Sequence, residues 1–481
     1  MSAAVPNHLI NFGKKPIGVQ SMKAIDVEYS RLLPINANST SIYSPTGVNR
    51  VYFRFPCFQN SVIDNARSYI TMKVTTGANK SASVGQRICD VGVGSLFDRI
   101  VIKSSTGVVL EDITNHHVLQ KLFKLMSTDD VESRATVGDY SGANMTQTEK
   151  GLLCGRQSSG ITYKFQFETG ILSKHLAQFL PIGMMNNGSA IAFDLELYLS
   201  DPKLCMQMIG DNSQTTGDAA ANPAVAAVNI EQTYTLSEVV YNMCLLKLDE
   251  SLMSKFNQLA KSNGELIIPF TTYRSHQSAL ATLQSVVMTS DACSDLRRAF
   301  VTIVDSAPPA VSAKEPIRFF GGVQGAAALC DDGVAGLTAA SEGVVTNVNY
   351  IIGNKRLFNE DVQTNGLVDN NLLLEHAQNS QYLNKSNEKM YCSRVINSKG
   401  GTSIFDQNMF LSANFTYTNP EKVSNGISLG GLPLQSRITV DKNGATQKRV
   451  VTFAECAYNL IIRNGEVNYV EIKPNPQDYS Y

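Results

Sequence analysis

The feature that most constrains the fold is a sequence repeat linking the two halves of the chain. Residues 235–246 align without gaps with residues 452–463, an offset of 217 residues (from 235 to 452) in a chain of 481. Four of the twelve aligned positions are identical, including Tyr241 and Tyr458, and most others exchange one apolar or small residue for another. Chance similarity of two strands is the alternative. We predict two tandem copies of one domain, with Tyr241 and Tyr458 in equivalent positions when one half is superposed on the other.

Apolar and polar residues alternate in short segments along both halves, which is typical of antiparallel strands with one buried face. Clusters of Gly, Asn, Pro and Ser separate these segments. The chain is therefore predicted to be all-β. The predicted strands include residues 48–55, 69–74, 97–103, 161–167, 191–199, 265–270, 285–288, 299–304, 350–353, 409–418 and 434–440.

Three segments have the periodicity of helices. Residues 110–126 place apolar side chains three and four apart, and residues 370–382 form a second candidate. Residues 250–261 form a third, closed by Gly264, and we place the boundary between the domains there. The predicted organisation is an N-terminal arm at 1–29, a first β-domain at 30–249, a connecting helix at 250–264, a second β-domain at 265–470 and a tail at 471–481.

Composition argues against several classes of protein. The 41 basic residues nearly balance the 42 acidic ones, so we expect no sequence-specific binding of nucleic acid. The exception is the N-terminal arm, where Lys14, Lys15 and Lys23 could make a weak phosphate contact, although a flexible tail is the simpler interpretation. The nine cysteines are scattered without a Cys-x-x-Cys motif, which favours reduced thiols over disulfides. No signal peptide or membrane span is recognisable, so we expect synthesis in the cytosol.

We find no catalytic signature, cofactor motif or metal-ligand spacing. His116 and His117 are adjacent, and adjacent positions on a helix point about 100° apart, so we interpret them as an exposed or capping pair. The acidic pair at 331–332 is interpreted as a solvated loop tip. Residues 441–444 begin like a calcium loop, but Thr452 stands where the loop needs a glutamate. We predict that the chain is not an enzyme and has no catalytic, cofactor or metal site.

Four phrases of the sequence carry a resemblance to a known family. They are INANSTSIYSPTGVNRVYFRFP at 35–56, SLFDRIVIKSSTGVVLEDITNHHVLQKLF at 95–123, YIIGNKRLF at 350–358 and NLIIRNGEVNYVEI at 459–472. With the predicted architecture, they resemble the double jelly-roll major capsid proteins of tailless icosahedral DNA viruses. That lineage includes adenovirus hexon and the capsids of virophages and polinton-like viruses. The resemblance covers most of residues 30–470.

The resemblance implies two tandem jelly-roll sandwiches and a structural role in the virion capsid. It implies a homotrimer forming a pseudo-hexameric capsomer, assembled inside the host cell, with neighbouring capsomers, penton and minor capsid proteins as partners. The long insertions at 128–160, 201–229 and 305–346 would be outward towers or clamps. The alternative is a β-sandwich that binds or cleaves polysaccharide, which the absence of Trp disfavours.

Overall fold

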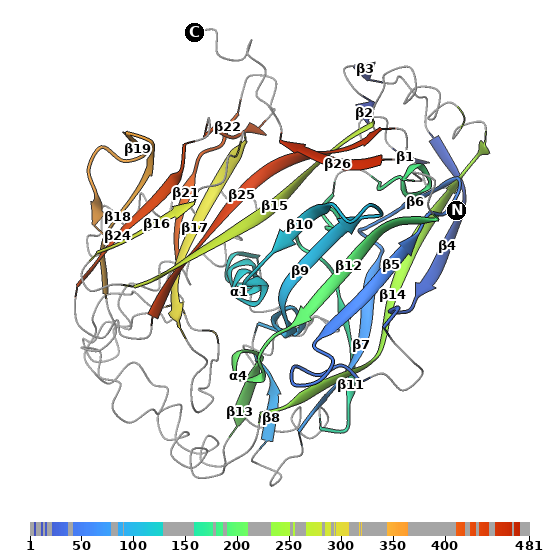
Figure 1. Cartoon of the computed structure of the whole chain (residues 1–481), viewed down its shortest axis with the longest axis horizontal. Helices are drawn as coiled ribbons and strands as arrows, with labels where there is room; N and C mark the ends of the chain where they lie inside the picture. Colours follow the sequence, from blue (N-terminus) through green and yellow to red (C-terminus); the bar gives the residue numbers. More distant parts are fainter. Residues whose placement is uncertain are drawn as a thin grey trace.

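A computed structural model shows two jelly rolls side by side, joined around helix α1 (Figure 1). None of the helices in the described part of the chain is long and apolar enough to cross a membrane. The structure describes residues 4–5, 11–12, 15–16, 22–36, 42–77, 85–89, 91–127, 158–176, 179–185, 190–209, 232–250, 254, 266–280, 284–289, 293, 295–306, 317, 319, 344–363, 410–418, 424–429, 432–441, 448–463 and 466–471.

The first roll has eight principal strands in two antiparallel sheets. In chain order they are β4 (Met22–Leu32), β5 (Arg50–Pro56), β7 (Tyr69–Thr76), β9 (Phe97–Ser104), β10 (Val109–Ile113), β11 (Ile161–Phe165), β12 (Ile191–Leu199) and β14 (Tyr234–Leu248). One sheet contains the first, eighth, third and sixth of these strands, and the other contains the fifth, fourth, seventh and second. Two four-stranded sheets connected in this order form a jelly roll.

The second roll repeats this order. Its strands are β15 (Leu266–Ala279), β16 (Gln284–Thr289), β17 (Leu296–Asp305), β18 (Val344–Ile352), β19 (Lys355–Arg356) with β20 (Val362–Gln363), β21 (Phe410–Asn414), β24 (Leu434–Asp441) and β25 (Lys448–Arg463). One sheet runs β15-β25-β17-β21 and the other runs β16-β24-β18-β19, with β20 also on β18. The prediction of two tandem jelly rolls is confirmed.

Short elements complete the fold. They are β1 (Ala4–Val5), β2 (Asn11–Phe12), β3 (Lys15–Pro16), β6 (Ser61–Ile63), β8 (Gly85–Ile88), β13 (Met206–Ile209), β22 (Tyr417–Thr418), β23 (Ser424–Asn425), β26 (Glu466–Glu471), α1 (His116–Ser127), α4 (Pro202–Cys205) and the 3-10 turns Val93–Leu96 and Ile182–Met184.

The alternation seen in the sequence places one face of each strand in the core. In β5, the side chains of Val51, Phe53 and Phe55 are buried and the intervening ones are half-exposed. The ring of Phe55 stacks on Phe193 of β12 with centroids 4.2 Å apart. Its other neighbour is Tyr241 of β14 in the opposite sheet, 4.9 Å away. Aromatic contacts of this kind hold the two sheets of the first roll together.

The two copies of the repeat occupy the same place in the two rolls. β14 and β25 are each the eighth strand, and each pairs with the first and third strands of its sheet. Tyr241 and Tyr458 therefore lie on equivalent strands, which the predicted duplication requires, and both are buried. Their neighbours differ, because Tyr241 contacts Phe53 and Phe55 whereas Tyr458 contacts Phe270 and Arg274.

Two predicted boundaries are wrong. Residues 22–29 are not part of an arm, because β4 pairs with β14 from Ala24, opposite Leu248, to Leu32, opposite Tyr241. Four charged residues, at 23, 26, 28 and 31, interrupt the apolar pattern of this strand in the sequence. The helix predicted at 110–126 is a strand followed by a helix, β10 and α1. Asn115 separates them with a φ of 52°, and its carbonyl accepts the first backbone hydrogen bonds of α1.

Other predictions fall largely outside the described residues. Of the connecting helix at 250–264, only positions 250 and 254 are described, and the helix at 370–382 is not. Most of the three long insertions is likewise outside the described part.

Candidate functional site

The two rolls meet at a junction formed by β10, α1 and residues 167–174 of the first roll and by β15 of the second. Polar contacts cap the outer edge of β15. The Gly170 N–H donates to the carbonyl of Thr271 at 2.9 Å, and the Thr169 hydroxyl donates to the same oxygen at 3.0 Å. The hydroxyls of Thr114 and Ser275 form a hydrogen bond across the junction. An edge strand that would otherwise be open is thus closed by the first roll.

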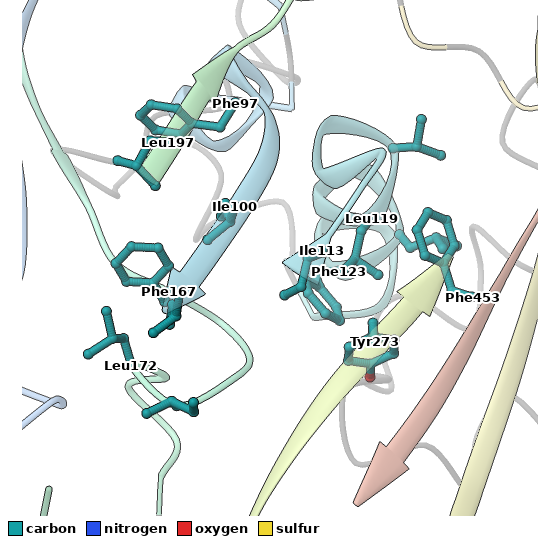
Figure 2. Packing of buried hydrophobic residues seen from close by; sticks show 14 of the residues in the cluster. Phe97, Ile100, Ile113, Leu119, Phe123, Phe167, Leu172, Leu197, Tyr273 and Phe453 are labelled. Carbon is teal, nitrogen blue, oxygen red and sulfur yellow. The ribbon is translucent and has the colours of Figure 1, made fainter. Parts of the chain in front are cut away.

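Helix α1 supplies the apolar part of the junction. Figure 2 shows Phe123 beside Tyr273, and their ring centroids are 5.3 Å apart in an edge-to-face arrangement. Lys121 is almost fully buried; its ammonium donates to the Ile317 carbonyl and lies 5.1 Å from the Phe319 ring. The helix therefore packs against the second roll with an aromatic ring and a cation–π contact, which fixes the relative position of the rolls.

A single buried carboxyl, Glu111 of β10, links three segments of the junction. The Thr272 hydroxyl of β15 donates to Oε1, and the Ile171 N–H donates to Oε2 at 3.1 Å. Burial raises the pKa of Glu111 to about 7, and the nearby charge of Asp112 adds to the shift. Gly170 has a φ of +87°, and a Cβ at this position would collide with the Glu111 carboxyl, so only glycine fits.

A cavity of about 330 Å³ lies beside this carboxyl, between β10 and β15. On its wall the Arg274 guanidinium lies 5.1 Å from the ring centroid of Tyr458. Asp112 is held by two hydrogen bonds from Arg99, at 2.8 and 2.6 Å. The cavity is lined by Val109, Leu110, Glu111, Asp112, Thr114, Thr272, Tyr273, Arg274, Ser275, His276 and Tyr458.

The histidine pair is buried, which corrects the prediction that it is exposed or a cap. His116 Nδ1 lies 3.3 Å from the carbonyl oxygen of Phe97, and its Nε2 lies 3.0 Å from Gln120 Nε2. Burial lowers the pKa of His116 to about 4, so this ring is neutral at pH 7. His117 Nδ1 lies 3.0 Å from Asp98 Oδ1. The pair is buried because α1 packs on β9, which the sequence spacing does not reveal.

The other candidate residues form no site in the described part of the chain. Nowhere in that part do three His, Cys, Asp or Glu side chains gather as metal ligands would. The pair at 331–332, most of 441–444, and Lys14 lie outside it. Lys15 is in β3 and Lys23 in β4. The described cysteines are free thiols, namely Cys57, Cys89, Cys205, Cys244, Cys293 and Cys456.

The sequence does not predict that Glu111, Gly170 and Thr272 lie together. The one feature of the sequence that could indicate this site is a glutamate within the LEDI sequence of β10, where Leu110 and Ile113 are buried. The partners that bury it are 60 and 161 residues away in the chain. Separations of this size cannot be read from local spacing.

Comparison with known proteins gives likeness of fold. No protein-family model and no curated protein matches the sequence. Solved structures do match: a chain of the Sputnik virophage has a TM-score of 0.55 at 10% identity, covering 99% of this chain and 94% of that one. PBCV-1 VP54 has a TM-score of 0.54 at 10% identity, with 95% and 99% covered. A chain of the PBCV-1 virus capsid has a TM-score of 0.52 at 11% identity, again with 95% and 99% covered.

At such low sequence identity, these structural similarities establish the fold of the chain and nothing finer. The chain is a double jelly-roll protein. Its fold is that of PBCV-1 VP54, over nearly the full length of both chains.

Proposed function

We propose that this protein is a viral major capsid protein that trimerises into pseudo-hexameric capsomers and tiles an icosahedral virion shell. The observation that carries the proposal is the pair of rolls with identical strand order, docked side by side. Three such chains around a threefold axis place six similar sandwiches in a ring. Closed symmetry of this kind satisfies contact surfaces without open-ended growth.

The surface of the first roll supports self-association. Large apolar side chains are exposed in the described residues between β4 and β5, 33–36 and 42–49, including Leu33 at 63%, Ile35 at 47% and Ile42 at 58%. On either side, the backbone of these residues is hydrogen-bonded to the sandwich: the Ile35 N–H donates to the Tyr52 carbonyl at 2.8 Å, and Tyr43 pairs with Leu236. A fixed segment that presents apolar side chains to water is typical of a protein contact surface.

The same proposal assigns the partners and the location. Copies of the chain and neighbouring capsomers cover the flanks, penton and minor capsid proteins complete the shell, and the chain performs no catalysis. The insertions at 128–160, 201–229 and 305–346 form the towers or clamps between neighbours, and the lysines near the N-terminus make a weak contact with the interior.

Native mass spectrometry tests the assembly. Three chains of 52.3 kDa give about 157 kDa, and negative-stain images of that species should have a near-hexagonal outline. A stable 52.3 kDa monomer at micromolar concentration would contradict the proposal. Cleavage of a glycan panel that one carboxylate substitution abolishes would favour the polysaccharide alternative.

A further inference from the structure

Glu111 is unusual because it is a buried acid at the contact between two domains without a basic partner. Each of its oxygens accepts one hydrogen bond from a neutral donor, Thr272 or the Ile171 N–H. No cationic side chain in the described part of the chain forms an ion pair with it. A buried carboxylate held only by neutral donors is costly, whereas the protonated acid is not.

We propose that Glu111 is a proton-controlled contact between the two rolls, which closes the junction when protonated and loosens it when ionised. In the acid form the carboxyl O–H donates to the Thr272 oxygen, because that hydroxyl can rotate to accept. The carbonyl oxygen still accepts from Ile171, so both oxygens of the carboxyl remain paired. On ionisation the proton passes to solvent and the negative charge is left on a buried carboxylate that has no basic partner in the described part of the chain.

The charged and titratable groups around Glu111 have partners of their own. On β10 and β9, Asp112 is paired with Arg99. On β15 and β25, Arg274 lies over the ring of Tyr458, and His276 is one of the residues that line the cavity. In the segment after β11, Glu168 is paired with Lys174 and His175. Asp98 of β9 is paired with His117 of α1. The side chains of His116 and Lys121, also on α1, are buried.

The direction of the pH effect follows from the pKa of Glu111, which is raised from an ordinary 4.5 to about 7. The closed junction binds the proton more tightly than the open one. The stabilising contribution is therefore complete below about pH 4.5, falls as the pH rises towards 7, and is lost above it. The junction should be firm in acid and looser at neutral and alkaline pH.

Hydrogen–deuterium exchange of the full chain tests the proposal at residues 109–113 and 271–276. Corrected for intrinsic amide chemistry, opening of both segments should increase roughly 10- to 30-fold between about pH 5.5 and about pH 8, given pKa values of about 7 closed and 4.5 open. In E111Q the increase should disappear, because the amide oxygen accepts from Ile171 and the NH₂ donates to the Thr272 oxygen.

Two further variants keep the test decisive. D112N removes a neighbouring charge from the same strand and should retain the increase. T272V removes the side-chain partner of Glu111 across the junction in both protonation states, so both segments should open more readily at pH 5.5 than in the wild-type protein. An increase with pH that persists in E111Q, or opening at pH 5.5 that is unchanged in T272V, would overturn the proposal. None of these readouts depends on trimer formation.

Discussion

At the scale of single residues, Gly170 is the position where the junction tolerates least change. Its φ of +87° strains any other residue, and a Cβ there would overlap the Glu111 carboxyl. We expect G170A to lower the free energy of unfolding by roughly 2–4 kcal/mol, from backbone strain plus overpacking. Denaturant titration measures this. The matched control is G107A, which has a φ of +86° but open space at the Cβ, so strain alone should cost about 1 kcal/mol. Equal losses in the two variants would contradict the account.

The buried pair Arg298–Glu455 makes a second residue-scale prediction. Arg298 Nη1 lies 3.1 Å from Glu455 Oε2, and both side chains are buried. Removing only the arginine, in R298M, leaves an unpaired buried charge and should cost about 3–5 kcal/mol. Replacing both, in R298M/E455L, should recover most of that loss. The half-exposed Arg99–Asp112 pair is the control, since D112N should cost at most about 1 kcal/mol. A double variant no more stable than R298M would refute the interpretation.

The repeat shows how far a residue can be interpreted from sequence. Glu238 and Glu455 are aligned and identical, yet Glu238 is exposed on a bulge with a φ of 51° and lies 3.7 Å from Lys73 Nζ. Glu455 is buried against Arg298. The alignment predicted the common strand correctly, because alternation and turns are local properties. The alignment could not predict that one glutamate is exposed and the other buried. That difference depends on the residues of the neighbouring strand and on where one extra residue shifts the pairing register.

At the scale of elements, dependence on distant contacts also explains why the helix predicted from residue 110 begins only at His116. Apolar spacing over 110–126 fits a helix, but Glu111 pairs with Ile102 of β9 and meets Thr272, contacts that favour a strand. Tertiary contacts override local preference here. Strand order across each sheet, in contrast, follows from the repeat together with the resemblance to a double jelly roll. The junction joins segments of both rolls that no local pattern connects.

The segment between β4 and β5 gives a prediction about assembly. Leu33 and Ile35 are exposed, and the Ile35 N–H donates to the Tyr52 carbonyl, a backbone hydrogen bond that aspartate at these positions would keep. L33D/I35D should weaken trimer formation roughly tenfold or more, by placing charges in an apolar contact. Its thermal stability as a dissociated chain should be unchanged. Native mass spectrometry over a dilution series measures the effect, with V108D, an exposed valine at the β9–β10 turn, as the control. Equal weakening of trimer formation by L33D/I35D and V108D would contradict the assignment of this segment as a trimer contact.

At the scale of the whole molecule, the buried core runs through both rolls without interruption. Phe123 of α1 connects the two parts of this core, because its ring packs against the fully buried Tyr273 of the second roll. This continuity couples the two sandwiches, so the wild-type protein should unfold in one calorimetric transition.

Truncation of the Phe123 side chain should uncouple the unfolding of the two rolls. F123A removes a buried ring from the junction, with an expected loss of about 3–5 kcal/mol, while the sandwich cores remain intact. The single transition should then split in two, because each roll can unfold without the other. The control is F55A, which removes a ring from inside the first roll and should lower the midpoint of one undivided transition, since α1 still joins the rolls. Two transitions in the wild-type protein, or one in F123A, would mean that α1 does not carry the coupling.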